Sequence, residues 1–232
     1  MKPLKTHPDF KYIPSDNPYW HKIKQVKPFA FTDNDTEEFK GKWKSQFLSP
    51  PKKLHVEIGC NGAHVSLQWA KQNPQDGYIG IDWKYKQIYF AYEKAKKMGV
   101  QNLILLRAYA ERTHYMFDEA EIDHLYLFFP DPWEKMHQKK HRIVTKDWLI
   151  KIAHIVKKGG TFEIRTDHKE YFEWMQKQIA QTQEHWSIET LTSDRHKDRP
   201  DAHLLKIPEV TLFERVFIRD QLPIHQVVLK RT

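Results

Sequence analysis

The residues best able to do chemistry in this sequence are two carboxylates that stand at the ends of short apolar runs. Glu57 lies in Val56-Glu57-Ile58-Gly59-Cys60-Asn61-Gly62, and Asp82 ends Gly80-Ile81-Asp82 twenty-five residues later. Gly59 and Gly62 permit a tight turn and a close approach by a ligand. The helix that follows offers free N–H groups, and an acid at the second position suits ribose hydroxyls. We therefore predict a nucleotide-like cofactor held by Glu57, Gly59, Asn61, Gly62 and Asp82.

The charge of this loop favours S-adenosylmethionine over a dinucleotide. The loop lacks the G-x-G-x-x-G pattern that a pyrophosphate site prefers. A carboxylate at Glu57 would repel a pyrophosphate, but it suits the cationic methionine portion of S-adenosylmethionine. A nicotinamide-dependent dehydrogenase is thus disfavoured. A structural strand–helix turn at Gly59 and Gly62 is the alternative.

The most distinctive stretch is Phe128-Phe129-Pro130-Asp131-Pro132-Trp133, directly after a buried apolar run. Two prolines fix the backbone and hold Asp131 in one place. Trp133 offers a flat surface on which a base could stack. The pattern therefore indicates a rigid loop that presents Asp131. The alternative is a turn with only a structural role.

A basic run follows this stretch, with four fixed positive charges and two histidines between Lys135 and Arg142. Its position beside the predicted catalytic loop indicates phosphate contacts, so Lys135, Lys139 and Arg142 are expected to bind RNA. The alternative is a solvated face. The whole chain carries 38 Lys and Arg against 30 Asp and Glu, a net charge of +8, which fits a polyanionic partner.

The elements that must position these residues alternate between strands and helices. The predicted strands are 54–58, 78–83, 103–106, 124–129 and 161–166, and the predicted helices are 65–72, 85–98, 146–156 and 171–181. This order predicts an α/β fold with a mostly parallel sheet, which binds ligands beyond the carboxyl ends of its strands.

The ends of the chain are expected to differ from this regular pattern. Residues 1–33 read as an irregular N-terminal arm and residues 34–232 as a single domain, which opens with a helix over 34–47 capped by Asp35. Three late runs, 186–191, 211–218 and 226–229, read as strands, and the last two as an antiparallel edge hairpin.

Several classes of protein and site are excluded by composition. No run of about 18 apolar residues exists, so no membrane span is expected. Cys60 is the only cysteine, which rules out an intrachain disulfide and a cysteine-based zinc cluster. No metal site is predicted, and a reducing cytoplasm fits.

Taken together, these motifs resemble the bacterial tRNA (guanine-N7-)-methyltransferase family. The matching pieces span roughly residues 54–216 in the family's order: Glu57-Ile58-Gly59, Gly80-Ile81-Asp82, Phe128 to Arg142, Thr166-Asp167, and Thr211 to Glu214. The resemblance implies a Rossmann-like class I methyltransferase fold. It implies transfer of a methyl group from S-adenosylmethionine to N7 of a guanosine in tRNA. We expect a cytoplasmic protein that is a monomer or a homodimer.

The resemblance also implies roles for matched positions. Glu57, Asp82 and the loop glycines would hold S-adenosylmethionine, and Asp131 would be the carboxylate of the catalytic site. Lys135, Asp167, Thr211 and Glu214 would contact the RNA. Carboxylates at Asp167 and Glu214 suit the donors on the Watson–Crick edge of guanine. Alternatively, Thr211 and Glu214 are a water-facing pair on an edge strand.

Three positions depart from the family pattern. Asn61 and Ala63 replace glycines, and Tyr109 replaces a carboxylate that helps bind the cofactor. We expect Tyr109 to hold the adenosine end by stacking and main-chain hydrogen bonds; the alternative is that it points into the core. These departures leave two other functions open: a divergent paralogue that methylates another RNA, and an RNA-binding pseudoenzyme.

Overall fold

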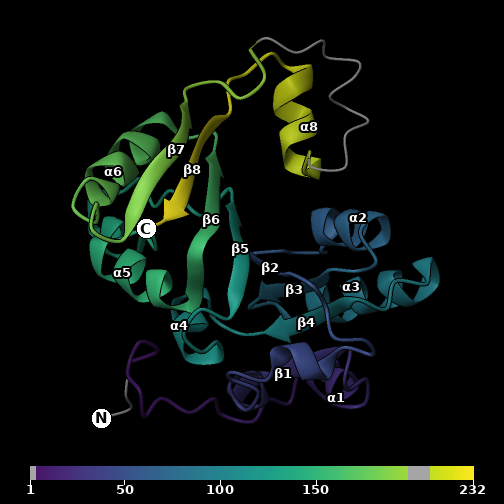
Figure 1. Cartoon of the computed structure of the whole chain (residues 1–232). Coiled ribbons are helices and arrows are strands. Elements are labelled where there is room, and N and C mark those ends of the chain that lie inside the picture. Colours follow the sequence, from purple (N-terminus) through teal and green to yellow (C-terminus); the bar gives the residue numbers. More distant parts are fainter. Residues whose placement is uncertain (1–3, 198–209) are drawn as a thin grey trace.

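The computed structural model describes residues 4–197 and 210–232 (Figure 1). None of the described helices is long and apolar enough to cross a membrane. The helices and strands, in chain order, are α1 (Pro18–Lys24), β1 (Ala30–Thr32), β2 (Leu54–Ile58), α2 (His64–Gln72), β3 (Gly77–Asp82), α3 (Tyr85–Met98), β4 (Leu103–Arg107), α4 (Thr113–Met116), β5 (Ile122–Phe128), α5 (Lys146–Ile155), β6 (Val156–Thr166), α6 (Lys169–Ile179), β7 (Trp186–Thr192), α8 (Leu212–Arg219) and β8 (His225–Arg231).

Eight strands form one sheet in the order β1-β4-β3-β2-β5-β6-β8-β7. All pairs from β1 to β6 are parallel, and the β6–β8 and β8–β7 pairs are antiparallel. The predicted α/β class with a mostly parallel sheet is confirmed. Because these parallel strands share one direction, the residues after β2, β3, β4, β5 and β6 gather at one edge of the sheet.

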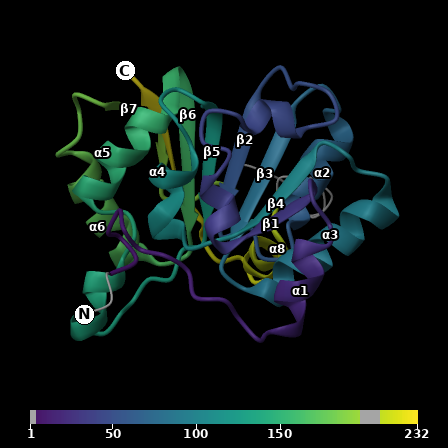
Figure 2. The same ribbon diagram turned by 90° about the horizontal axis from the view of Figure 1, so that it is seen from below.

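Helices cover the two faces of the sheet and bury two apolar clusters. On one face α5 and α6 contribute Leu149, Ile152 and Met175, which pack against strand residues such as Ile58 and Leu127. On the other face α2 and α3 bury a second cluster, and α1 lies beside α3 (Figure 2). Burial on both faces explains the continuous apolar runs of the central strands.

The antiparallel edge exists, but its strands differ from the predicted pair. The antiparallel partner of β8 is β7, with Ile188 opposite Leu229, and helix α8 separates these two strands along the chain. The predicted strand over 211–218 is wrong, because this segment is helix α8. Thr211 caps the helix and accepts from the Glu214 N–H at 2.9 Å, while the Glu214 side chain bonds back to the Thr211 N–H. This reciprocal capping box fixes a helix start.

The prediction of an irregular arm over residues 1–33 is also wrong. The arm contains α1, which begins after the capping residue Asn17. It also contains β1, which pairs in parallel with β4 and places Phe31 opposite Leu106. The arm therefore adds the outermost strand of the sheet on the side away from β7.

The helix predicted over 34–47 is replaced by two short 3₁₀ helices, Asp33–Glu37 and Trp43–Gln46. Gly41 lies between them with a φ of +75°, a left-handed conformation that ends a right-handed helix. Glu121 then accepts from the backbone N–H groups of Gly41 and Trp43, both at 2.9 Å. Asp35 lies inside the first 3₁₀ helix and caps no α-helix.

Candidate functional site

The loop after β2 is a tight turn closed by main-chain bonds. Gly59 has a φ of +76°, and the N–H groups of Gly59 and Cys60 donate to the Ile81 carbonyl at 2.8 and 3.0 Å. Asn61 and Ala63 have φ values of +49° and +51°, so both adopt the left-handed conformation that favours glycine. The two departures from the family's glycines therefore preserve the shape of the turn.

Space beside this turn is open at Gly59. A Cβ added at Gly59 would meet no atom within 4 Å, whereas one at Gly62 would lie 3.1 Å from Lys94 Nζ. Helix α2 starts at His64, directly after the turn. The first N–H groups of a helix lack intrahelical partners, so this turn can receive a polar ligand.

Asp82 lies at the end of β3 and is linked to the turn. Its Oδ2 accepts from the Asn61 N–H at 3.0 Å, and its Oδ1 accepts from the Lys84 N–H at 2.8 Å. Burial raises the pKa of Asp82, while these two hydrogen bonds oppose the shift. Each carboxylate oxygen can accept more than one hydrogen bond, so a diol could bind here too.

Glu57 lies within β2 and is almost fully buried. Its Oε2 accepts from the Ser66 hydroxyl of α2. Burial raises the pKa of Glu57 from 4.5 to about 7, and the hydrogen bonds from Ser66 reduce that shift. A buried carboxylate with a raised pKa favours a cationic ligand, because a nearby positive charge would restore the ionised form.

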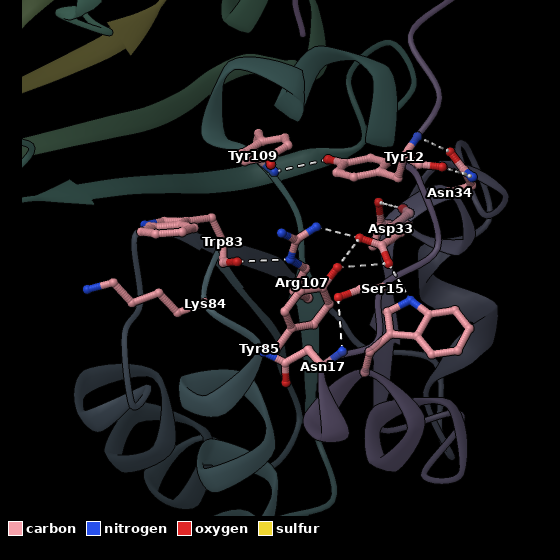
Figure 3. A network of polar contacts seen from close by, with 12 residues as sticks. Tyr12, Ser15, Asn17, Asp33, Asn34, Trp83, Lys84, Tyr85, Arg107 and Tyr109 are labelled. Carbon is pink, nitrogen blue, oxygen red and sulfur yellow. Dashed lines mark hydrogen bonds and ion pairs between the residues drawn. The ribbon is translucent and has the colours of Figure 1, made fainter.

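Arg107, the last residue of β4, and Tyr109, two residues after it, contact the N-terminal arm (Figure 3). The Tyr109 N–H donates to the Tyr12 hydroxyl at 3.1 Å, and the two rings stack with centroids 5.4 Å apart. Tyr109 is half-buried and belongs to neither buried apolar cluster. The alternative that it points into the core is excluded. The main-chain donor expected for adenosine is taken by Tyr12 in this structure.

The loop after β5 holds Asp131 in a strained backbone. Phe129 and Trp133 have φ values of +52° and +45°, which costs free energy for residues with a Cβ and clusters at functional sites. The Phe129 N–H donates to the Arg165 carbonyl of β6 at 2.8 Å. Asp131 itself is exposed. A rigid loop thus presents one free carboxylate beside the sheet edge.

The basic run divides into exposed lysines and one buried arginine. Lys135 and Lys140 are exposed and Lys139 is half-buried, which leaves the lysines able to reach phosphates. Arg142 is 3% exposed. Its Nε donates to the Pro132 carbonyl at 2.8 Å, and its guanidinium lies 4.8 Å from the centre of the Tyr171 ring. The prediction that Arg142 binds phosphate is wrong; this side chain holds the Asp131 loop.

Asp167 directly follows β6 and is half-buried. The next residue, His168, lies 3.5 Å from the Glu134 carboxylate in the Asp131 loop. The β6 and β5 loops are thereby brought together. This placement keeps Asp167 as a predicted substrate-binding residue at the same edge.

The side chains of Thr211 and Glu214 bond to other groups of the protein and are not free to contact a guanine. Glu214 is fully buried, and its carboxylate lies 3.1 Å from Arg165 Nη1, 3.1 Å from Arg195 Nε and 2.5 Å from His196 Nε2. Burial raises the pKa of Glu214, but the His196 hydrogen bond and the two arginines outweigh it and lower the pKa overall. Both the RNA-contact prediction for Glu214 and the water-facing edge-strand alternative are wrong. The Thr211 hydroxyl is used as the helix cap.

Helix α8 nevertheless lies at the site. The Phe213 ring packs 4.9 Å from the Phe129 ring of the Asp131 loop, and Arg215 Nη2 lies 3.5 Å from His64 of α2. The exposed side chains of Leu212, Phe213 and Val216 face outward from this helix. α8 therefore connects the Asp131 loop to the turn before α2.

The comparisons with known proteins agree with this geometry. A family model described as "Putative methyltransferase" matches residues 51–227. The tRNA (guanine-N(7)-)-methyltransferase of Lachnoclostridium phytofermentans is 31% identical over 200 residues, covering 85% of this chain and 89% of that protein. The chain belongs to the tRNA (guanine-N7-)-methyltransferase family.

Two other relatives are covered over a smaller share of their length. A bifunctional glycosyltransferase/methyltransferase of Fusobacterium nucleatum is 30% identical over 203 residues, which cover 87% of this chain but 30% of that protein. The tRNA (guanine-N(7)-)-methyltransferase of Streptococcus thermophilus is 34% identical over 140 residues, 60% of this chain and 65% of the relative. The chain thus spans less than two thirds of the length of these two relatives.

Solved structures support the fold. A 16S rRNA methyltransferase superposes with a TM-score of 0.59 and 16% identity, covering 82% of this chain and 90% of the other. An antibiotic-related methyltransferase gives a TM-score of 0.57 and 17% identity, covering 78% and 89%. The predicted class I methyltransferase fold is confirmed.

The positioning roles of three residues do not follow from the sequence patterns. Arg142 and Arg165 hold the Asp131 loop, and Ser66 bonds Glu57. The spacing of Ser66 nine residues after Glu57, on the first turn of a predicted helix, was the one usable signal. Arg142 stands in a run of basic residues, and a sequence does not distinguish a buried arginine from a solvated one.

Proposed function

We propose that this protein transfers the methyl group of S-adenosylmethionine to N7 of a guanosine in tRNA, in the cytoplasm. The observation that best supports this proposal is the order of the site residues along the sheet. Arg107, Asp82 and Glu57 belong to the neighbouring strands β4, β3 and β2, and Asp131 follows the next strand, β5. A cofactor laid across these strand ends would meet Asp82 with its ribose and Glu57 with its methionine portion, and would leave Asp131 for the methyl acceptor.

The residues present fit S-adenosylmethionine. The open space at Gly59 leaves room for a ligand against the turn. Asp82 and Glu57 are buried carboxylates with raised pKa values, and a diol and a cation respectively satisfy such groups. When bound, S-adenosylmethionine supplies an activated methyl group on a sulfonium.

The chain's own residues then have a modest chemical task. Guanine N7 carries a lone pair and no proton, so no general base is required. Positive charge develops on the guanine as the new bond forms, and a fixed carboxylate at Asp131 stabilises that charge. The loop prolines and the Arg142–Pro132 bond hold this carboxylate still, so that alignment contributes to the rate.

The RNA partner is supported by the lysines of the basic run. Lys135 and Lys140 are exposed beside the Asp131 loop, and phosphate contacts of this kind position RNA without reading its sequence. Asp167 lies at the same edge and is proposed to read the Watson–Crick edge of the target guanine.

One experiment separates this function from the two alternatives. The protein is incubated with labelled S-adenosylmethionine and, in parallel, with unmodified tRNA and ribosomal RNA, and digested nucleosides are then separated. We expect label in 7-methylguanosine from tRNA. Label in ribosomal RNA alone would indicate a divergent paralogue. RNA binding with no transfer of label would indicate a pseudoenzyme.

A further inference from the structure

The N-terminal arm closes a cavity of about 550 Å³ at the end of β4. Arm residues 9–15 form one wall, and Tyr85, Arg107 and Tyr109 form the other. Within the wall that the arm forms, Phe10 and Tyr12 are the two aromatic residues. Four aromatic residues line the cavity together with the polar residues Asp9, Lys11, Ser15 and Arg107, and its volume lies in the range of small-ligand sites.

The arm is anchored here by a buried polar network (Figure 3). Asp33, which is buried, accepts from Trp20 Nε1 at 2.6 Å, from the Tyr85 hydroxyl at 3.1 Å and from Arg107 Nη1. Arg107 Nε donates to the Trp83 carbonyl at 2.9 Å, and its guanidinium lies 3.9 Å from the centre of the Tyr85 ring. Because every member is hydrogen-bonded, this network holds the arm against β4 and against the turn after Asp82.

The cavity lies one strand away from Asp82, because Arg107 of β4 lines it. Arg107 is the register partner of Asp82 on the neighbouring parallel strand, and such strands lie about 4.8 Å apart. Asp131 follows β5, on the opposite side of β2. A base attached to a ribose on Asp82 and directed away from the methyl acceptor would point toward this cavity.

The chemistry of the walls suits a purine. Tyr12 and Tyr109 stack with an interplanar angle of 11°, so the site already holds flat rings in parallel. Burial raises the pKa of Tyr12, which keeps its phenol protonated and able to donate to a ring nitrogen. The hydroxyl accepts from the Tyr109 N–H, and this bond fixes its direction.

We propose that the N-terminal arm is part of the cofactor site and that Tyr12 binds the adenine ring, in place of the carboxylate that Tyr109 replaces. This inference rests on the proposed function, since it takes S-adenosylmethionine as the ligand. It assigns a ligand contact to the arm, which the sequence motifs alone leave without a role.

Calorimetry with S-adenosylhomocysteine tests the contact. Tyr12→Ala should weaken binding about tenfold, as the loss of one aromatic partner implies. Tyr12→Phe should recover only the part of the affinity that the ring supplies, because it lacks the hydroxyl donor. Tyr19→Ala is the matched control, because Tyr19 is an arm tyrosine that packs on Tyr89 outside the cavity; it should change affinity less than twofold. Equal affinity in Tyr12→Ala and wild type would overturn the proposal.

A shortened ligand shows which part of the cofactor Tyr12 meets. Methylthioadenosine keeps the base and ribose but lacks the amino-acid portion. Tyr12→Ala should weaken its binding by the same factor as for S-adenosylhomocysteine, whereas Glu57→Gln should affect S-adenosylhomocysteine only. If Tyr12→Ala weakens S-adenosylhomocysteine alone, the adenine assignment is wrong.

Hydrogen exchange of the wild-type protein provides a readout that needs no variant. Addition of S-adenosylhomocysteine should slow amide exchange in residues 9–13 as well as in the turn at 59–63. Slowing in the turn with no change in the arm would contradict the proposal and leave the proposed function standing. If wild type binds neither ligand, the proposed function itself fails.

Discussion

The main-chain N–H of Asn61 donates to the Asp82 carboxylate at 3.0 Å, and this bond joins the turn after β2 to the end of β3. Asn61 can point its N–H at Asp82 because it adopts a left-handed conformation, with a φ of +49°. The turn and the acid therefore form one unit.

Asp82→Ala should weaken S-adenosylhomocysteine binding by about 1.5–3 kcal/mol, the range for hydrogen bonds to a charged group. The substitution removes the acceptor for the ribose and also frees the Asn61 N–H. Calorimetry measures the change. Asp147→Ala, which removes an exposed carboxylate on α5, is the control. Unchanged affinity in Asp82→Ala would disprove the ribose placement.

Cofactor affinity should depend on pH through Glu57, whose pKa is raised by burial to about 7. A cationic ligand needs the ionised carboxylate, so below pH 7 affinity should fall by about tenfold per pH unit. In the protein without ligand the raised pKa has the opposite effect: the stability that Glu57 contributes is present below its ordinary value of 4.5 and is lost as pH rises through 7.

Calorimetry from pH 5.5 to 8 checks this dependence. Glu57→Gln should bind S-adenosylhomocysteine weakly, with an affinity that changes little across the range. A wild-type affinity that stays constant between pH 5.5 and 8 would show that Glu57 does not face the ligand's positive charge.

Asp131→Asn should lower the single-turnover rate about a hundredfold, the loss expected for one preorganised electrostatic partner. Affinity for S-adenosylhomocysteine should stay within twofold, because Asp131 serves the acceptor. Glu134→Gln removes another exposed carboxylate of the same loop and should have a far smaller effect. Rates within twofold of wild type in Asp131→Asn would reduce this loop to a structural turn.

The basic run should respond differently at its lysines and at its arginine. Neutralising Lys135 and Lys139 together should flatten the log–log salt dependence of tRNA binding by about 1.4–1.8. Arg142→Ala should leave that slope unchanged and instead lower the melting temperature and the turnover, because Arg142 is buried against Pro132. Filter binding at several salt concentrations distinguishes the two effects, and an unchanged slope in the lysine variant would mean a merely solvated face.

Glu214 should stabilise the folded protein, and its contribution to the free energy of unfolding should depend on pH. Its pKa is lowered below 4.5, so its contribution is present above pH 4.5 and is lost as pH falls through the folded-state pKa. Glu214→Gln breaks a buried ion-pair cluster and should cost about 3–5 kcal/mol at pH 7. The gap to wild type in chemical unfolding should shrink below pH 4.5. A gap independent of pH would contradict this role.

The sequence predicts the central part of the fold because the pattern of apolar residues within each segment there is enough to tell a strand from a helix. The strand 54–58 and the helix 85–98 coincide with β2 and α3. The segment 211–218 misled because its β-branched and aromatic residues resemble a strand, yet Thr211 and Glu214 have capping-box spacing, a helix signal. Arg142 and Tyr12 could not be assigned from the sequence, since their roles depend on Pro132, ten residues away, and on Tyr109, 97 residues away.

Methyl transfer to tRNA transcripts made with guanosine or with 7-deazaguanosine tests the central claim most directly. In 7-deazaguanosine a carbon replaces N7, so the nucleophile is absent while the Watson–Crick edge is kept. With labelled S-adenosylmethionine we expect label in the guanosine transcript, recovered as 7-methylguanosine, and none in the 7-deazaguanosine transcript, although both transcripts bind equally. Equal labelling of the two transcripts, or labelling of neither, would contradict the account.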